Sequence, residues 1–365
     1  MKEKDTIVKY LLANKVNVLL GAGAPKIKLQ DSSSEFPLMK DLISTVFNNS
    51  EVLELIGKIK DANNNQKDII LDLIEKAKYN VEELLSVLEN AEAFITDEEI
   101  KLCLQCLVKK IKSLIVERIL SSSDSESVNS YYNFFSVLRN LNEIKNFNNI
   151  INIFSTNYDM VCEKSFEKLN IHYYNGFIGN MNKTFNPTFY KYKYVESIDL
   201  NRTKYYQKKD HFNLYKLHGS FSWRLDSIGN LIEIQDYKND INECKLIYPS
   251  SNKYISVALL PYYSTLLREF SNNINQEKSV LITVGYSYGD LHINSLIKEA
   301  LMLDQFTLIA CIFDDSKVDY TFDCLGGIRN NIIIISGVQN ATLSAITKLI
   351  NSSFEVEEKE ETTNE

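Results

Sequence analysis

Four short polar segments hold the residue types best suited to chemistry, and each of them follows an apolar run. The segments are "GAG" (Gly21–Gly23), "STNYD" (Ser155–Asp159), "LHGS" (Leu217–Ser220) and "GYSYGD" (Gly285–Asp290). Glycines directly after a buried strand let the backbone approach a phosphate group. An asparagine amide can orient a substrate without titrating, and a neutral histidine can act as a base near ambient pH. Such a set could bind a dinucleotide and activate a nucleophile.

Each segment also has a plain structural explanation. One Gly-x-Gly after a strand is as often a tight turn, and Thr156, Asn157 or Asp290 could cap the helix that follows it. A single histidine on an apolar strand, such as His218, is commonly a core residue. Four polar loops at the ends of predicted strands of one sheet are harder to explain structurally, because open α/β sheets bind ligands at that edge.

The apolar runs predict the sheet that would position these segments. Near-continuous apolar stretches followed by amphipathic helical patterns indicate buried parallel strands joined by crossover helices. The predicted strands are 16–20, 149–155, 213–217, 244–249, 279–285, 306–313 and 331–336, and the predicted helices include 160–169, 262–272, 291–303 and 341–351. The fold class is therefore α/β, with a Rossmann-like, doubly wound parallel sheet.

Two insertions interrupt this pattern. A helical block over about 38–141 lies in the first crossover, and a smaller insertion over about 177–212 is rich in tyrosine and lysine. We treat 1–354 as one domain that carries both insertions, and we expect the acidic tail, 355–365, to be disordered. The smaller insertion interleaves tyrosine and lysine as a nucleic-acid surface would, but a half-exposed β-ribbon has the same alternation. Direct nucleic-acid binding is therefore uncertain.

Composition and cysteine usage set further bounds. The 365 residues are 44% hydrophobic and 24% charged, with a net charge of −8 that the acidic tail dominates. No apolar run is long enough to span a bilayer, and the N-terminus lacks a signal-peptide core. Six irregularly spaced cysteines favour a reducing compartment, and they predict no metal site because a structural zinc needs four grouped ligands. We expect a cytoplasmic protein without membrane contact.

Taken in order, "GAGAP", "STNYD", "LHGS" and "GYSYGDLHIN" resemble the sirtuin-like NAD-consuming domains of bacterial antiphage defence proteins. The segments "EFPLMKDL" (35–42) and "IYPSSNKY" (247–254) are similar to two further elements of that family. The resemblance spans Val16 to about Phe313 and leaves the helical block unmatched.

The resemblance implies an NAD site and cleavage of the nicotinamide–ribose bond to give nicotinamide and ADP-ribose, which would deplete NAD in abortive infection. It implies that Asn157 and His218 are catalytic. The NAD-binding residues that follow from it are Gly21, Ala22, Gly23, Thr156, Asp159, Gly285, Ser287 and Asp290. We further expect a valine at Gly23 to obstruct the pyrophosphate, and Gly219 to expose the ring of His218.

Three departures from the family bear on the substrate. Pro25 stands where a serine or threonine is usual, and the arginine that follows the proline loop of protein-deacylating sirtuins is absent, with Lys40 the nearest cation. Those deacylases also carry a four-cysteine zinc ribbon after the histidine, whereas 221–248 holds only Cys244. We therefore expect an NAD hydrolase without zinc. An NAD-dependent protein deacylase and a non-catalytic nucleotide-sensing module are the alternatives, and cyclisation of the substrate is a variant.

The resemblance also suggests partners. Chains of this size resemble sirtuin-like defence proteins that are paired with a HerA-like hexameric ATPase. We expect a homo-oligomer, a partner of that kind, or the helical insertion to hold the activity off, because an unregulated NAD hydrolase would kill its host.

Overall fold

The computed structural model describes residues 2–25, 39–122, 125–144, 150–198, 204–208, 211–237, 244–246 and 260–361. Its centre is a seven-stranded sheet in the order β15-β14-β13-β1-β2-β8-β3, and every neighbouring pair is parallel. The strands are β1 (Lys15–Leu20), β2 (Ile151–Ser155), β3 (His172–Tyr174), β8 (His211–Lys216), β13 (Ser279–Val284), β14 (Phe306–Ile312) and β15 (Ile332–Ser336). The doubly wound α/β prediction is confirmed.

Two strands differ from the sequence prediction. The edge strand β3 was not expected, because three residues are too short to give a periodic signal. The prediction of a sheet strand over 244–249 was wrong for its described part: β12 (Lys245–Leu246) pairs antiparallel with β9 (Gly219–Ser220), outside the central sheet. Residues 35–38 and 247–254, which carry parts of the two further family-like segments and the end of this predicted strand, lie outside the described residues.

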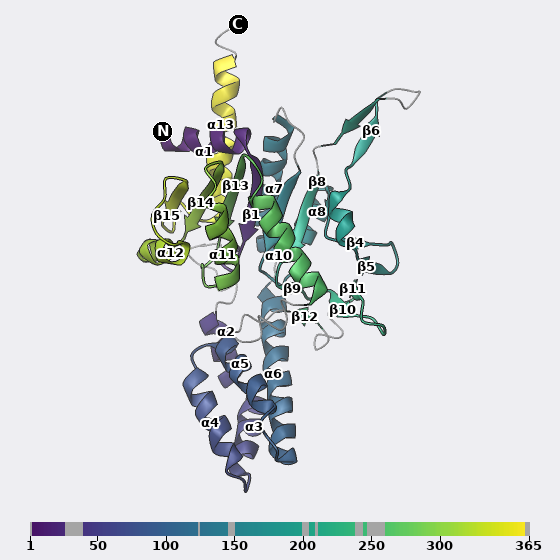
Figure 1. Cartoon of the computed structure of the whole chain (residues 1–365), viewed down its shortest axis with the longest axis vertical. Helices are drawn as coiled ribbons and strands as arrows, with labels where there is room; N and C mark the ends of the chain where they lie inside the picture. Colours follow the sequence, from purple (N-terminus) through teal and green to yellow (C-terminus); the bar gives the residue numbers. More distant parts are fainter. Residues whose placement is uncertain are drawn as a thin grey trace.

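Helices cover both faces of the sheet (Figure 1). One face packs on α1 (Lys2–Ala13), α7 (Ser125–Ile144), α8 (Val161–Lys168) and α13 (Leu343–Glu361). The other face packs on α10 (Pro261–Ile274), α11 (Leu291–Ala300) and α12 (Val318–Leu325). Because both faces are covered, the strands are apolar almost throughout, which is why their sequences read as continuous runs rather than alternating ones.

The helical insertion forms a lobe with its own core, drawn below the sheet in Figure 1. Its helices are α2 (Met39–Phe47), α3 (Ser50–Asp61), α4 (Gln66–Ala77), α5 (Val81–Glu92) and α6 (Glu98–Ser122). The separate core ends with α6, since α7 packs into the core of the sheet. Phe221 belongs to the core of the lobe, and Tyr158 packs against that core. The lobe therefore adjoins the carboxyl edge of the sheet, next to the segments that contain Tyr158 and precede Phe221.

The second insertion builds two small β structures. Strands β4 (Phe177–Ile178) and β5 (Lys183–Phe185) join β10 (Trp223–Leu225) and β11 (Leu231–Glu233) in a four-stranded sheet. After the 3-10 helix η1 (Pro187–Lys191), β6 (Val195–Ser197) and β7 (Tyr205–Gln207) form a separate two-stranded ribbon.

Helix α13 continues into the acidic tail, through Glu361. Disorder of the tail from 355 stays a prediction. Glutamate and lysine are good helix formers, so the acidic run lets the preceding helix continue.

Within the described ranges, no helix combines the length and apolar character needed to cross a membrane.

Candidate active site

The four polar segments meet at the carboxyl edge of the sheet. Backbone hydrogen bonds carry the strand ladder past the strand ends: Gly21 N–H donates to the Val284 carbonyl at 3.0 Å, and Thr156 N–H to the Leu20 carbonyl at 3.0 Å. Leu217 N–H donates to the Ser155 carbonyl at 2.8 Å. Strand β1 lies between β2 and β13, so the loops after β1 and β13 meet where the strand order reverses. Open α/β sheets bind ligands at this position.

Gly21, Gly23 and Gly285 bring two of these loops into backbone contact. A Cβ added at Gly21 would lie 2.5 Å from the Gly285 carbonyl oxygen, and one at Gly23 would lie 3.1 Å from it. Gly285 has φ of +67°, and a Cβ there would fall on the Ala24 amide nitrogen. The expectation that a valine at Gly23 would first meet a pyrophosphate is corrected: it would first meet Gly285.

Most backbone amides of the loop after β1 already donate hydrogen bonds within the protein. Gly23 N–H donates to the Gly285 carbonyl at 2.9 Å, and Ala24 N–H to the Gly21 carbonyl at 2.9 Å. Together with the Gly21 bond to Val284, this engages two of the three amides that the sequence analysis assigned to a phosphate, those of Gly21 and Gly23. Ala22 is exposed at the tip of the turn, so it is the residue of this loop best placed to face a ligand.

We predict that Gly285→Ala lowers the free energy of unfolding by several kcal/mol. A non-glycine residue at positive φ costs about 1–3 kcal/mol, and the contact with Ala24 adds to it. Gly57→Ala is the matched control, because that glycine lies inside α3 with nothing within 4 Å of an added Cβ. The control should gain roughly 0.5–1 kcal/mol through helix propensity. Urea titrations measure both changes, and equal stability of the Gly285→Ala and wild-type proteins would contradict the prediction.

Asn157 ties the end of β2 to the end of β1. Its side-chain Nδ2 donates to the Gly21 carbonyl oxygen at 3.1 Å and lies 3.4 Å from the Tyr131 hydroxyl of α7. Its backbone N–H donates to Ser155 Oγ at 3.1 Å. The side chain is buried and therefore held in one orientation. Sequence reasoning did not anticipate Tyr131, because nothing in a helical pattern marks one buried tyrosine as a partner of a loop asparagine.

His218 pairs with Asp290 across the edge of the sheet. His218 Nε2 lies 2.9 Å from Asp290 Oδ2, and both side chains are at most 8% exposed. The other carboxylate oxygen, Oδ1, accepts from the amides of His292 and Ile293 at 3.0 and 3.1 Å, which caps α11. Asp290 was expected to accept a ribose hydroxyl or to cap this helix. The structure shows the cap and adds an unexpected partner 72 residues away in sequence.

The charge state of Asp290 defines the tautomer of His218. Burial raises the pKa of the Asp290 carboxyl, but the bond and charge of His218 and the two capping amides lower it more, so the pKa lies below its usual value. An ionised carboxylate only accepts hydrogen bonds. In a neutral imidazole, this bond places the proton on Nε2 and makes Nδ1 the acceptor nitrogen. This is the arrangement that a general base needs when a carboxylate orients it.

The role expected for Gly219 is corrected. The ring of His218 is buried rather than exposed by the glycine. Gly219 has φ of +88°, and a Cβ on it would collide with the Lys245 carbonyl of β12 and approach Tyr263 Oη to 2.7 Å. Glycine is required here so that β9 and β12 can pair. The Tyr158 ring lies 6.5 Å, centroid to centroid, from that of His218 and sits beside it at the edge.

The remaining predicted site residues lie in different environments. Ser287 is exposed and Thr156 is half-buried, so both are accessible from the edge. Asp159 is buried, and its Oδ1 accepts from the Val161 amide at the start of α8 at 2.9 Å. His292 is exposed, as expected for a surface helix residue. The structure thus brings together His218 with Asp290, Asn157 with Gly21, and Gly23 with Gly285.

A buried charged cluster behind the edge was missed by sequence reasoning. Lys216, on β8, is 2% exposed; its Nζ donates to the Asp159 carbonyl and lies 3.7 Å from Glu163 Oε1. Glu163 Oε2 and Asp159 Oδ2 are buried and have no hydrogen-bond partner within the described residues. Burial raises the pKa of Glu163 to about 7, and the charge of Lys216 lowers it by less. The cluster holds the "STNYD" segment against β8.

We predict a specific pH dependence of stability from Glu163. Its pKa is raised from 4.5 to about 7 on folding. Its stabilising contribution is therefore complete below about pH 4.5 and is lost as the pH rises through about 7. The loss amounts to about 3 kcal/mol at most. The Glu163→Gln protein should lack this decline in urea titrations at pH 5 and 8. Glu167→Gln, on the exposed face of α8, is the control. A decline in Glu163→Gln as steep as in the wild type would refute the assignment.

The described residues contain no group of three histidine, cysteine, aspartate or glutamate side chains suited to hold a metal ion. Cys244 Sγ donates to the Phe221 carbonyl oxygen at 3.3 Å, and the residue is in no disulfide. Whether the protein uses zinc stays a prediction.

Comparison with known proteins gives one family match for the chain. Residues 151–320 match the family model described as SIR2-like domain. The match covers slightly less than half of the chain, from the first residue of β2 into α12. It includes Asn157, His218 and Asp290 but not Gly21–Gly23 or the helical lobe. The match supports a sirtuin-like, NAD-dependent activity. No curated protein matches the chain.

Proposed function

We propose that the protein is an NAD hydrolase that cleaves the nicotinamide–ribose bond. The observation that carries the proposal is the buried His218–Asp290 pair, at 2.9 Å, beside Asn157 at the ligand-binding edge of a doubly wound sheet. Nicotinamide is already a good leaving group, so the site needs no acid for it. It needs an oriented ribose and an activated water, and the two buried side chains are suited to supply them.

The residues divide this work as follows. His218 takes a proton from the attacking water at Nδ1 while Asp290 holds Nε2–H. Asn157, fixed by Gly21 and Tyr131, positions the ribose through its amide. Such positioning and base catalysis act on the oxocarbenium-like ribose that forms as the bond breaks. We assign contacts with the rest of NAD to the accessible Ala22, Thr156 and Ser287. Asp290 acts through His218, because both of its oxygens are already engaged.

A protein deacylase is the second candidate, and a nucleotide-sensing module without turnover is the third. Only Cys244 stands between 221 and 248, where deacylating sirtuins have a four-cysteine ribbon, so the sequence disfavours the deacylase. The test is the rate of nicotinamide release from NAD with and without an acylated lysine peptide. We expect release that is independent of the peptide. A strict requirement for peptide would favour the deacylase, and tight NAD binding without turnover would favour the sensor.

We further propose that the activity serves antiphage defence and is controlled by assembly, either of this chain or with a HerA-like ATPase. The support is the resemblance of the four motifs to defence proteins and the lobe that adjoins the catalytic edge. The nicotinamide assay is therefore run on the chain alone and together with the protein encoded by the neighbouring gene.

A further inference from the structure

The two-stranded ribbon of β6 and β7 has no buried face. Val195, Tyr205 and Tyr206 are all exposed, the two tyrosines by 60% and 48%. Figure 1 shows the ribbon projecting away from the sheet and the lobe. A half-exposed ribbon with alternating tyrosine and lysine buries one side, which was the structural explanation for this sequence pattern. The structure removes that explanation, since the rings on both sides of the ribbon are accessible.

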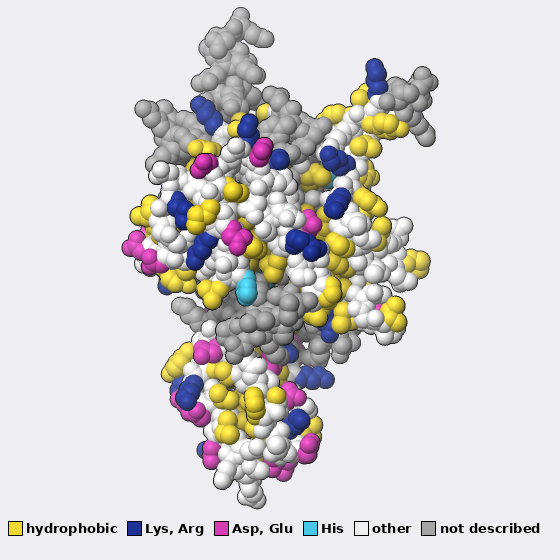
Figure 2. Space-filling model, viewed as in Figure 1, with side chains coloured by type: hydrophobic (Ala, Val, Ile, Leu, Met, Phe, Trp, Pro, Cys, Tyr) yellow, Lys and Arg dark blue, Asp and Glu magenta, His cyan; other side chains and the backbone are white. Residues whose placement is uncertain are grey.

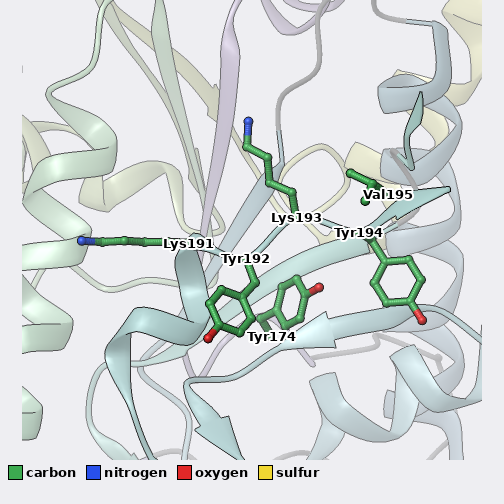
Figure 3. A pocket seen from close by; sticks show the side chains of 6 residues that line it. All are labelled: Tyr174, Lys191, Tyr192, Lys193, Tyr194 and Val195. Atoms are coloured by element: carbon green, nitrogen blue, oxygen red, sulfur yellow. The ribbon is translucent and has the colours of Figure 1, made fainter. Parts of the chain in front are cut away.

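At the base of the ribbon, tyrosines line a cavity of about 590 Å³. Tyr174, Tyr192 and Tyr194 form one wall, and Lys191 and Lys193 extend away from the rings, as Figure 3 shows. Tyr192 and Tyr194 are 51% and 37% exposed. The ring of His172 stacks on Tyr194 with 4.5 Å between centroids and 19° between planes. This contact covers one face of the Tyr194 ring and fixes its orientation. None of these residues belongs to the candidate active site.

The charge around these rings is positive although the chain is acidic. Lys191 and Lys193 are exposed, whereas the carboxylate of Glu196 is occupied by Lys208 at 3.3 Å. Figure 2 shows hydrophobic and basic side chains side by side on this part of the molecule. An anionic ligand with flat, apolar faces fits that chemistry.

We propose that Tyr192, Tyr194, Lys191 and Lys193, the tyrosine–lysine surface, bind single-stranded nucleic acid. Tyr174, which is 8% exposed, lines the cavity beside them and is not itself a stacking surface. Bases stack on accessible tyrosine rings whatever their sequence, and lysines neutralise the phosphates. A protein partner is disfavoured because lysine is depleted in protein interfaces, whereas here it alternates with the aromatic residues. The proposal is independent of NAD cleavage, since the surface shares no residue with the catalytic edge.

The test is fluorescence anisotropy of a labelled 20-nucleotide single strand, as DNA and as RNA, titrated with the full chain at 50 and 200 mM salt. We expect binding that weakens as salt rises. Tyr192→Ala and Tyr194→Ala should each weaken it about tenfold. Lys191→Gln combined with Lys193→Gln should weaken it and flatten its salt dependence. The matched control is Tyr79→Ala on the lobe, where a 78% exposed tyrosine also lies beside a lysine, with Lys78 Nζ 5.3 Å from the ring centroid.

Three results would overturn the proposal. One is the absence of binding at 50 mM salt, and another is binding that the tyrosine and lysine variants leave unchanged. The third is a tyrosine variant that alters the sedimentation mass of the protein without oligonucleotide, which would make the surface an interface between copies of the chain. Circular dichroism confirms that each variant is folded, and the lysine variant tests the surface without removing any ring.

Discussion

His218→Ala is expected to lower the rate of nicotinamide release from NAD by two to four decades. Removal of a general base typically costs about 3–5 kcal/mol of transition-state stabilisation. The ring is buried and aligned by Asp290, so no other described histidine can take its place from the same position. The measurement is kcat for nicotinamide release at saturating NAD, with urea titrations to establish that the variant is folded.

The same assay is run on a control variant, His292→Ala, and on a second active-site variant, Asn157→Ala. His292→Ala removes an exposed histidine two residues beyond Asp290 and should leave kcat unchanged. Asn157→Ala should lose about as much activity as His218→Ala, because the ribose is then no longer oriented. The double variant should be little worse than either single one, since residues that act as a unit are not additive. A folded His218→Ala protein with the wild-type rate would make His218 a structural residue.

Asp290→Asn is expected to have the next largest effect, a loss on the order of two to four decades in kcat. An asparagine amide can donate to Nε2, which favours the tautomer with the proton on Nδ1 and so removes the basic lone pair from the reacting side. Binding of NAD should change much less than kcat, because Asp290 acts through the histidine.

Stability separates this role of Asp290 from its capping role. Asparagine caps helices about as well as aspartate, so Asp290→Asn should keep the cap of α11. Asp290→Ala loses both the cap and the histidine partner, and it should lower the free energy of unfolding by roughly 1 kcal/mol more. If Asp290→Asn retained the full kcat, the assignment of Asp290 as the carboxylate that orients His218 would be wrong.

The fold was predictable because its strands are buried on both faces. Runs such as 279–284 and 306–312 are apolar along nearly their whole length, and each polar segment begins where such a run stops. Once the strands are parallel, their carboxyl ends share one edge. The positions of Asn157 and His218 at that edge follow from the sequence for the same reason.

The contacts within the edge were not predictable. A glycine after a strand looks the same whether a ligand or another loop requires it, and only the structure shows Gly285 against Gly21 and Gly23. The His218–Asp290 pair joins residues 72 positions apart, so no local pattern reveals it. Nothing in the sequence marks Lys216 as buried, because burial of a lysine depends on Glu163 and Asp159 from another part of the chain. Tertiary partners, rather than residue types, set these roles.

In the proposed function, this edge of the sheet breaks the bond between nicotinamide and ribose. The most direct measurement identifies, by mass spectrometry, the products formed when NAD is mixed with an excess of the purified protein, alone and with the protein encoded by the neighbouring gene. The proposed reaction gives nicotinamide and ADP-ribose in equal amounts from the wild-type protein, and His218→Ala should form both at least about a hundredfold more slowly. Intact NAD under both conditions, or cleavage at the pyrophosphate to give two mononucleotides, would contradict it.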